Sequence, residues 1–212
     1  SLRRAQQAVD SSWFKNEITP IEITTRKKTS MIDADEGPQT KDATKIPRLK
    51  PVFSAEGTIT AANASSISDG AANIHLSNKK FADKHHITPM AKIVAHHTHA
   101  QDPEWFTTAP LKAIQGVLSK ANWKTTDVDL FEINEAFAVV TMACIKELNL
   151  DPAKVNIHGG ACSLGHPIGA SGSRIVVTLI HALKQHNLHR GVAALCIGGG
   201  EATALAIELI GR

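Results

Sequence analysis

Residues 128–148 read VDLFEINEAFAVVTMACIKEL, and this stretch decides the fold class. Its first six residues are a short, mostly apolar run typical of a strand, and the remainder favours a helix. A strand that passes directly into a helix is the repeating unit of an α/β layered domain. Asn134 lies at the junction, where a helix N-cap belongs, and Glu135 falls in the expected first turn, where its charge favours the helix dipole. We expect this helix to run to about Leu148.

The same alternation continues on both sides of this stretch. Residues 110–121 carry four apolar side chains on one helical face. Further strands are expected at 91–95, 154–157, 192–197 and 203–209, and a further helix at 175–183. Three consecutive glycines join the last two strands, which is typical of a hairpin. Together these elements predict an α/β domain with a mixed, mainly parallel sheet that ends in an antiparallel pair.

The N-terminal part of the chain has a different character. Residues 1–10 carry apolar residues at near-helical spacing, and because the chain opens within a helix without Met, we expect residues to precede it. Residues 24–50 hold two prolines and many Thr and Lys, which indicates a loop region and not a core.

Composition excludes several classes of protein. The chain has 212 residues, of which 42% are hydrophobic and 20% charged, as in a globular protein. Its apolar stretches fall far short of the ~18 residues of a spanning helix, and no secretory signal opens it, so we expect no membrane association. A net charge of +3 gives no support for nucleic-acid binding. Three scattered cysteines favour a reducing, cytoplasmic setting without disulfides.

Three candidate residues lie at or just after the ends of predicted strands, where open α/β sheets place their ligands. Asn134 could act at a site or serve only as a helix cap. His166 lies in GGACSLGHPIGASG, where five glycines let the backbone approach a ligand closely; a structural histidine is the alternative. Cys196 opens the turn CIGGG, whose N–H groups could bind an anion, although a buried inert thiol is equally compatible.

A histidine, a cysteine, an asparagine and glycine-rich turns together supply a base, a thiol and oxyanion donors, which indicates acyl-transfer chemistry. Neither a P-loop nor a dinucleotide-binding glycine motif occurs. His97 and His99 would share one face of a strand, as paired metal ligands do, but no third ligand is evident, so no metal is expected.

At these residues the chain resembles the C-terminal part of the thiolases, the acyl-CoA C-acyltransferase family. NEAFA at 134–138, GGACSLGHPIGASG at 159–172 and CIGGG at 196–200 resemble its three C-terminal signature blocks in order. LKPVFSAEGTITAANASSISDG at 49–70 is similar to the family segment that lines the coenzyme A channel. The resemblance extends over residues 45–212 and is looser before them. Four ordered blocks are a specific signal.

The resemblance implies a role for five residues. His166 would deprotonate the acyl-accepting cysteine and help to bind the thioester oxygen of the second substrate. Asn134 would hold the water that completes that oxyanion hole. Cys196 would move the α-proton of the acetyl group that becomes the carbanion, and Gly198 would donate a backbone N–H to the other oxyanion hole. Ser65 would contact the pantetheine arm of coenzyme A.

The resemblance also implies an organisation for the whole chain. Residues 1–50 would be the loop region of the N-terminal half, 51–88 the end of the N-terminal thiolase domain, and 89–212 the C-terminal thiolase domain. The expected reaction joins two acetyl-CoA into acetoacetyl-CoA and CoA, with coenzyme A thioesters as substrates and no cofactor. The complete enzyme would be a homodimer or homotetramer in the cytoplasm.

Several features depart from the family pattern. None of the three cysteines lies in a context that resembles the family nucleophile, and Cys162 is expected to serve packing only. We therefore expect this chain to be inactive alone. One alternative is a ketoacyl-synthase-like condensing enzyme, although that class usually lacks the NEAF block and the Cys196 thiol. Another is a non-catalytic binding or assembly module.

Overall fold

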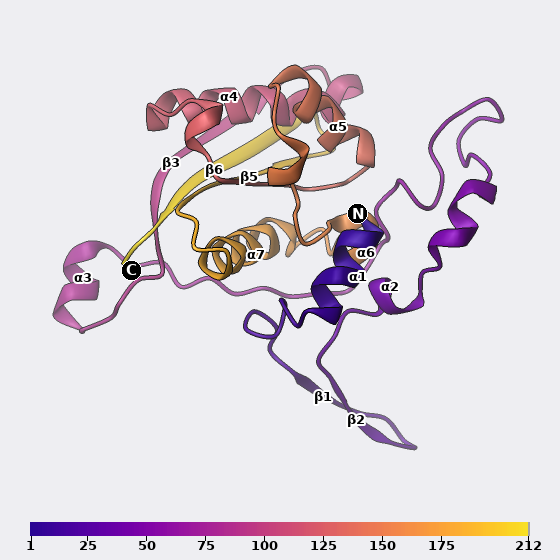
Figure 1. The fold of residues 1–212 in the computed structure, drawn as a ribbon, viewed down its shortest axis with the longest axis horizontal. Helices are drawn as coiled ribbons and strands as arrows, with labels where there is room; N and C mark the ends of the chain where they lie inside the picture. The colour runs from indigo at the N-terminus through magenta and orange to yellow at the C-terminus, as the bar shows by residue number, and fades with distance from the viewer. Residues whose placement is uncertain (212) are drawn as a thin grey trace.

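The computed structural model describes residues 1–211 and is built on a four-stranded sheet covered by helices on both faces (Figure 1). The strands of this sheet are β3 (Ala91–Ala100), β4 (Leu130–Ile133), β5 (Arg190–Cys196) and β6 (Glu201–Leu209). The helices that pack on it or beside it are α4 (Ala109–Ala121), α5 (Ala138–Glu147) and α7 (Ser171–Gln185), and the short α6 (Ala161–Leu164) contacts the N-terminal helices. Short 3-10 turns occupy Pro103–Thr108, Thr125–Asp127 and Pro152–Lys154. An α/β fold is thus confirmed.

The sheet has the order β3-β6-β5-β4. β4 pairs in parallel with β5, whereas β6 pairs antiparallel with both β5 and β3. The predicted mixed sheet and its final antiparallel pair are therefore confirmed. The expectation of mainly parallel pairing is wrong, because β6 inserts between two strands that run in the same direction and turns two of the three pairings antiparallel.

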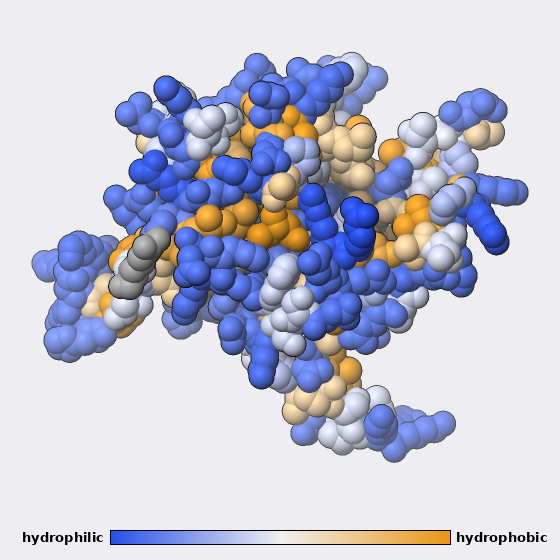
Figure 2. Space-filling view, viewed as in Figure 1, coloured by the Kyte–Doolittle hydropathy of each residue, from blue (hydrophilic) through white to orange (hydrophobic). Residues whose placement is uncertain are grey.

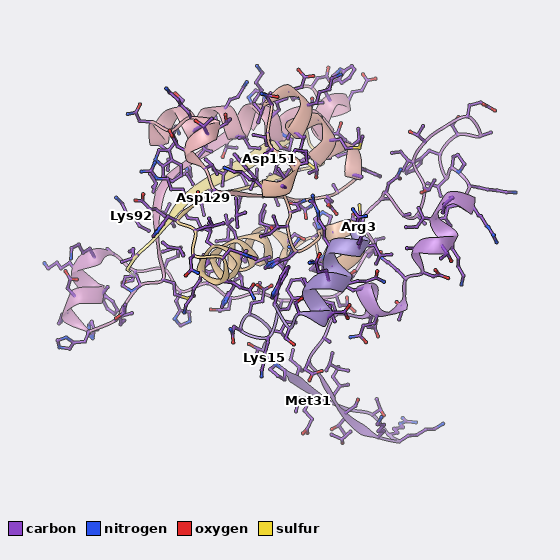
Figure 3. The ribbon with its side chains drawn as sticks, in the orientation of Figure 1. Arg3, Lys15, Met31, Lys92, Asp129 and Asp151 are labelled. Carbon is purple, nitrogen blue, oxygen red and sulfur yellow. The ribbon has the colours of Figure 1, made fainter. Side chains whose placement is uncertain are left out.

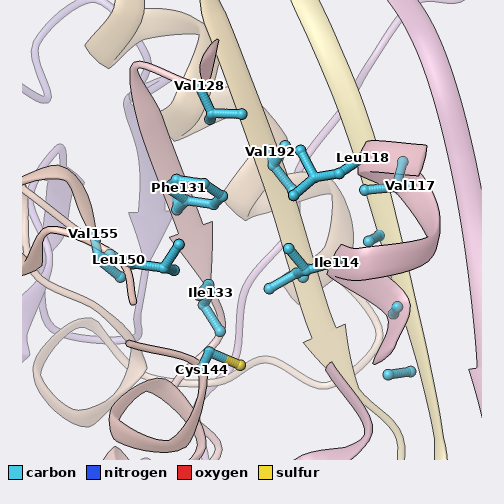
Figure 4. Packing of buried hydrophobic residues seen from close by; sticks show 14 of the residues in the cluster. Ile114, Val117, Leu118, Val128, Phe131, Ile133, Cys144, Leu150, Val155 and Val192 are labelled. Carbon is cyan, nitrogen blue, oxygen red and sulfur yellow. The ribbon is translucent and has the colours of Figure 1, made fainter. Parts of the chain in front are cut away.

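Two layers of buried side chains fill the space between sheet and helices. On one face α4 and α5 supply Ile114, Val117 and Cys144, which pack against Phe131 and Val192 of the sheet (Figure 4). On the opposite face α7 forms a second cluster, and Figure 1 shows α7 on the other side of the sheet from α4. The apolar face predicted for residues 110–121 is therefore a core face.

The N-terminal residues form α1 (Leu2–Asp10), which packs against the C-terminal part of the chain. Ala5 and Ala8 are fully buried. The Arg4 guanidinium donates to the carbonyls of Val155 and, at 2.8 Å, Pro152. Gly159 has φ +86° and lies so close to α1 that a side chain there would meet the backbone of Ala5.

The following residues are mostly exposed. β1 (Ile21–Thr24) and β2 (Thr29–Ile32) pair into a hairpin that projects from the rest of the molecule and carries Met31 (Figure 3). Figure 2 shows hydrophobic residues on this hairpin and hydrophilic ones at its tip; the exposed apolar side chains are Ile21, Ile23, Met31 and Ile32. The remaining elements are α2 (Glu36–Thr40), a 3-10 turn (Ala43–Arg48) and α3 (Lys79–Lys84).

Two local expectations are corrected. Residues 154–157 do not form a strand: a 3-10 turn precedes Val155, which makes a single parallel bridge to Phe131. The strand expected at 91–95 continues to Ala100, because β6 gives it a pairing partner along its full length, with one irregularity between Ile93 and Ala95. Among residues 1–211, no helix is long and apolar enough to span a membrane.

Candidate active site

Asn134 and Cys196 lie at the same edge of the sheet. Ile133 at the end of β4 pairs with Ala194 of β5, and the Asn134 N–H continues the ladder with a 2.9 Å bond to the Ala194 carbonyl. Cys196 ends β5 two residues further on. Because the two strands are parallel, both residues leave the sheet at its carboxyl end, which is the usual place for ligands in α/β proteins.

Asn134 is not a helix cap, which corrects the sequence expectation. α5 begins at Ala138, and its N-cap position is the extended residue Phe137. Asn134 is 1% exposed, and its Oδ1 atom has no hydrogen-bond partner among the described residues. An unpaired buried amide oxygen costs free energy, so its presence marks a position where a ligand or water can bind.

His166 contacts Asn134 directly. The His166 Nε2 atom lies 3.3 Å from Asn134 Nδ2, and its Nδ1 atom lies 2.5 Å from the Oγ of Ser171, the first residue of α7. Burial, and secondarily the charge of Arg174, lower the pKa of His166 below its usual range. The imidazole is therefore neutral at pH 7, as a general base requires.

Residues 63–67 connect the two blocks that carry Asn134 and His166. The N–H of Ser65 donates to the carbonyl of Ala136 at 3.0 Å, and the N–H of His166 donates to the carbonyl of Ser66 at 2.9 Å. Ser65 is half-buried. A segment more than sixty residues away in sequence thus positions both blocks and brings Ser65 beside them.

The turn after Cys196 is a tight one. The N–H of Gly200 donates to the carbonyl of Ile197 at 3.1 Å, which leaves Gly198 and Gly199 exposed at the tip. Neither of these two N–H groups donates a hydrogen bond to another described residue. Gly198 has open space where a side chain would project, so a ligand can approach its backbone.

Behind the candidate residues, a buried carboxylate fixes the NEAFA segment. Glu135 accepts hydrogen bonds from Cys162 N at 3.1 Å and from Asn156 Nδ2 at 3.3 Å. The Asn156 side chain also pairs with both backbone groups of Ile133 at 2.8 Å. A side chain at Gly160 would collide with the Glu135 carboxylate. Glu135 therefore ties the Asn134 block to the His166 block and does not act in a helix first turn.

The three thiols are buried, and burial raises the pKa of each. The pKa values of Cys144 and Cys162 rise to about 12, in the second case with help from the Glu135 charge. Thiols of this kind are protonated at neutral pH and are poor nucleophiles. Cys162 is buried, and of the three cysteines only Cys196 borders the turn at residues 197–200.

A cavity of about 320 Å³ lies beside this region, lined in part by Glu135, Asn63, Thr141 and Cys162. None of the five candidate residues lines it. The candidate site is therefore described by the contacts around Asn134 and His166 and not by this cavity. Among residues 1–211, no cluster of three or more His, Cys, Asp or Glu side chains could hold a metal ion.

Sequence reasoning missed the residues that support the site. Ser171 was not among the candidate residues, and nothing in the sequence signals that its hydroxyl meets His166. Asn156 and Lys41 were not singled out, although Lys41 Nζ donates to Ser66 Oγ at 3.0 Å and to the Cys162 carbonyl at 2.7 Å. The contacts of Asn156 and Lys41 join segments distant in sequence, and the contact of Ser171 with His166 spans a turn, so no local pattern reveals them.

Comparison with known families identifies two models. The model described as "Thiolase, C-terminal domain" matches residues 87–209, and the model described as "Thiolase, N-terminal domain" matches residues 1–80. Together the two models cover nearly all of the chain.

Individual relatives are similar over almost the whole chain. The mitochondrial acetyl-CoA acetyltransferase of Rattus norvegicus is 49% identical over 98% of the chain and 49% of the relative. The cytosolic acetyl-CoA acetyltransferase of Mus musculus is 45% identical over 98% of the chain and 53% of the relative. The chain thus spans about half the length of these curated relatives.

Solved structures agree. The Bacillus anthracis acetyl-CoA acetyltransferase superposes with a TM-score of 0.93 at 41% identity, over 99% of this chain and 54% of that one. The Acat5 thiolase from Ascaris suum in complex with coenzyme A superposes with a TM-score of 0.87 at 39% identity, over 99% and 53% respectively.

Proposed function

The chain belongs to the thiolase family, and from this membership we propose that it supplies the carbon–carbon bond-forming part of an acetyl-CoA acetyltransferase site. The observation that carries the proposal is the 3.3 Å approach of Asn134 Nδ2 to His166 Nε2 at the carboxyl edge of the sheet. The expected overall reaction is two acetyl-CoA to acetoacetyl-CoA and CoA.

In the proposed reaction, the first acetyl group is carried by a nucleophilic cysteine that is none of Cys144, Cys162 and Cys196. His166, neutral and with a lowered pKa, takes the proton of that thiol. CoA leaves as a thiolate while the acetyl thioester forms on the enzyme, and the CoA thiolate then takes the proton of the Cys196 thiol. Because burial raises the pKa of Cys144 and Cys162 to about 12, neither thiol ionises readily at neutral pH. This supports the proposal that another cysteine is the nucleophile.

In the second half-reaction, the Cys196 thiolate takes the α-proton of a second acetyl-CoA, and the resulting carbanion attacks the enzyme-bound acetyl group. The bond from the acetyl carbon to the nucleophilic cysteine breaks, and this cysteine recovers its proton from protonated His166. The developing enolate is unstable in water, so fixed donors at its oxygen lower the barrier more than binding alone. His166 and a water held by Asn134 supply these donors. The Gly198 N–H, which has no partner among the described residues, is the donor for the other oxyanion, and Ser65 contacts pantetheine.

The proposal includes an organisation. Residues 1–50 act as the loop region, 51–88 as the end of the N-terminal domain and 89–212 as the C-terminal domain. The active species is a homodimer or homotetramer, and its location is the cytoplasm, although relatives are named both cytosolic and mitochondrial. Mass determination in solution and cell fractionation test these two points.

The function is tested by assaying acetoacetyl-CoA formation from acetyl-CoA with the protein translated from the complete reading frame of this chain. Sustained formation of acetoacetyl-CoA supports the proposal. Condensation that requires malonyl thioesters would favour a decarboxylating synthase. Binding of CoA without turnover of any acyl-CoA would favour a binding or assembly module.

A further inference from the structure

We infer that Ser171 is a positioning residue that holds His166 in the tautomer with its proton on Nδ1, so that Nε2 keeps a free lone pair. The inference rests on the proposed function, because it explains how His166 could accept a proton. It is carried by the hydrogen bonds of Ser171, a residue with no exposed surface that begins α7.

The Ser171 hydroxyl has one hydrogen to donate and two neighbours. Its Oγ lies 3.0 Å from the carbonyl of Pro167, which can only accept. The same Oγ lies 2.5 Å from His166 Nδ1. If the hydroxyl donates to the carbonyl, it must accept from Nδ1–H, and the neutral imidazole then carries no proton on Nε2.

The other side of the ring agrees with this assignment. Asn134 Nδ2 lies 3.3 Å from Nε2, and an amide nitrogen can only donate. In this arrangement Nδ1–H, the Ser171 hydroxyl and one Asn134 N–H all have acceptors. The atom left without a partner is Asn134 Oδ1, an acceptor.

The opposite tautomer would need two changes. The Ser171 hydroxyl would have to donate to Nδ1, and the Asn134 amide would have to rotate so that Oδ1 accepts from Nε2–H. The Asn134 amide nitrogen would then lose Nε2 as its hydrogen-bond acceptor. Because the Asn134 side chain is only 1% exposed, its two N–H groups would be buried without that partner. Buried unpaired N–H groups are rarer in proteins than buried unpaired carbonyl oxygens. The Nδ1–H tautomer is therefore favoured.

The test measures the tautomer directly. The ¹⁵N-labelled 212-residue chain is studied at pH 7 by long-range ¹H–¹⁵N correlation, and His166→Gln identifies the His166 signals among the eleven histidines. We expect Nδ1 to resonate as a protonated nitrogen and Nε2 as an unprotonated one. A protonated Nε2 in the unsubstituted chain would overturn the inference, and this result needs no folded variant.

Three variants separate positioning from packing. Ser171→Ala should shift the Nε2 signal toward the protonated position, whereas Ser171→Thr, which keeps the hydroxyl, should retain the original pattern. Ser173→Ala is the matched control on the same helix and should leave the His166 signals unchanged, because Ser173 makes no side-chain bond to His166. An Nδ1–H tautomer that persists in folded Ser171→Ala would overturn the assignment.

A kinetic measurement separates this inference from the proposed function. In an active enzyme, Ser171→Ala should lower kcat at pH 7 by about 10- to 100-fold with KM for acetyl-CoA within about twofold, because general-base catalysis is impaired and binding is not. A rise in KM alone would contradict the inference. If the complete protein forms no acetoacetyl-CoA at all, the proposed function fails while the tautomer remains decided by the spectra.

Discussion

The groups around His166 come from separate segments of the chain, and each contributes one type of hydrogen bond. Asn134 extends β4, Ser171 begins α7, and Ser66 lies in the segment between the loop region and the domain. A neutral imidazole held on both ring nitrogens and at its backbone N–H has little freedom to rotate. Such preorganisation allows a base to act without reorganising its surroundings during the reaction.

The proposed division of labour predicts that two substitutions have different effects in the complete enzyme. Cys196→Ala should abolish condensation but leave acetylation of the nucleophile measurable, because CoA can take its proton from water, whereas the carbon–carbon step needs this residue as its base. His166→Ala should impair both steps. Rapid-quench measurement of protein-bound acetyl and of acetoacetyl-CoA separates the two steps.

The matched control is Cys144→Ala, which removes a fully buried thiol of the same core cluster that has no proposed chemical role and should retain condensation. The assignment of Cys196 is wrong if Cys196→Ala condenses acetyl-CoA within about tenfold of the unsubstituted rate, a difference of only ~1.4 kcal/mol in the barrier.

The hydrogen bonds between the Asn156 side chain and the backbone of Ile133 predict that a substitution at Asn156 lowers stability strongly. Asn156→Ala leaves both backbone groups of Ile133 without their side-chain partners in a buried position. We expect the free energy of unfolding to fall by about 3 kcal/mol, since each unsatisfied buried group costs about 1–3 kcal/mol. Chemical denaturation measures this loss.

Asn187→Ala is the control for the backbone, because Asn187 has φ 55°, close to the 47° of Asn156, but is exposed. The difference between the two variants therefore reports the buried hydrogen bonds alone. Equal destabilisation by both substitutions would mean that the Asn156 side-chain hydrogen bonds add nothing to the free energy of unfolding, and that the whole effect comes from the left-handed backbone conformation.

At this scale the sequence identifies the chemical groups but not their supports. Asn134, His166 and Cys196 stand out because each follows a predicted strand and lies in an unusual glycine-rich or acidic setting. Ser171 and Asn156 act through contacts with residues far from them in the chain or across a turn. Their residue types are common at helix starts and in turns, so sequence alone gives no reason to single them out.

At the scale of elements, the junction between residues 1–20 and α7 holds buried acidic groups. Thr178 of α7 donates to Glu17 Oε1 at 2.9 Å, and Glu17 Oε2 is buried without a partner among the described residues. Burial raises the pKa of Glu17 to about 7, with Thr178 and Arg174 opposing the shift. Burial likewise raises the pKa of Glu132 to about 8.

The sign of the resulting pH dependence follows from linkage. The folded state holds the Glu17 proton more tightly than the unfolded state, whose pKa is near 4.5. The associated stability is fully present below pH 4.5 and is lost as pH rises through about 7. Glu17→Gln removes this loss, because glutamine does not ionise. The free energies of unfolding of the variant and the unsubstituted chain should therefore be similar at pH 5, and that of the variant should be higher by about 1–2 kcal/mol at pH 8.

The comparison between variant and unsubstituted chain is essential, because His158 acts in the opposite direction. Burial lowers the pKa of His158 to about 4, so its contribution is lost as pH falls below about 6.5. Glu22→Gln, on the exposed hairpin strand β1, is the control and should give a difference that does not vary with pH. A constant difference for Glu17→Gln would contradict the interpretation.

The elements also show where periodicity succeeds and where it fails. Helices α4 and α7 and the hairpin β5–β6 lie where their apolar patterns predict, because these patterns report burial against one sheet face. The start of α5 is wrong by three residues, because Asn134 continues the β4 ladder and Glu135 binds Cys162. The insertion of β6 beside β3 depends on a pairing between chain segments about one hundred residues apart, which no local pattern encodes.

For the whole molecule, burial is distributed unevenly along the chain, and this predicts a proteolysis pattern. Limited digestion should cut first in the exposed hairpin and in the segments around residues 50–58 and 68–80, which have few buried side chains. Residues 89–211 should resist digestion. The sites are identified by mass spectrometry of the fragments.

The first seventeen residues should behave differently from the hairpin that follows them. Residues 1–17 should be protected, since Ala5, Ala8 and Phe14 are buried against the C-terminal part of the chain. Early cleavage within 2–10 would mean that α1 does not dock in solution. Resistance of the hairpin would mean that another surface covers it.

We propose that this chain carries the groups for proton transfer and oxyanion binding but no acyl-accepting nucleophile. The most direct measurement incubates the purified 212-residue chain with radiolabelled acetyl-CoA and follows protein-bound label and acetoacetyl-CoA, alongside the protein from the complete reading frame. We expect no thiol-labile label and no acetoacetyl-CoA for the chain alone, because the members of a catalytic unit do not act independently. Stoichiometric, thiol-labile labelling of Cys144, Cys162 or Cys196 in the chain alone would contradict it.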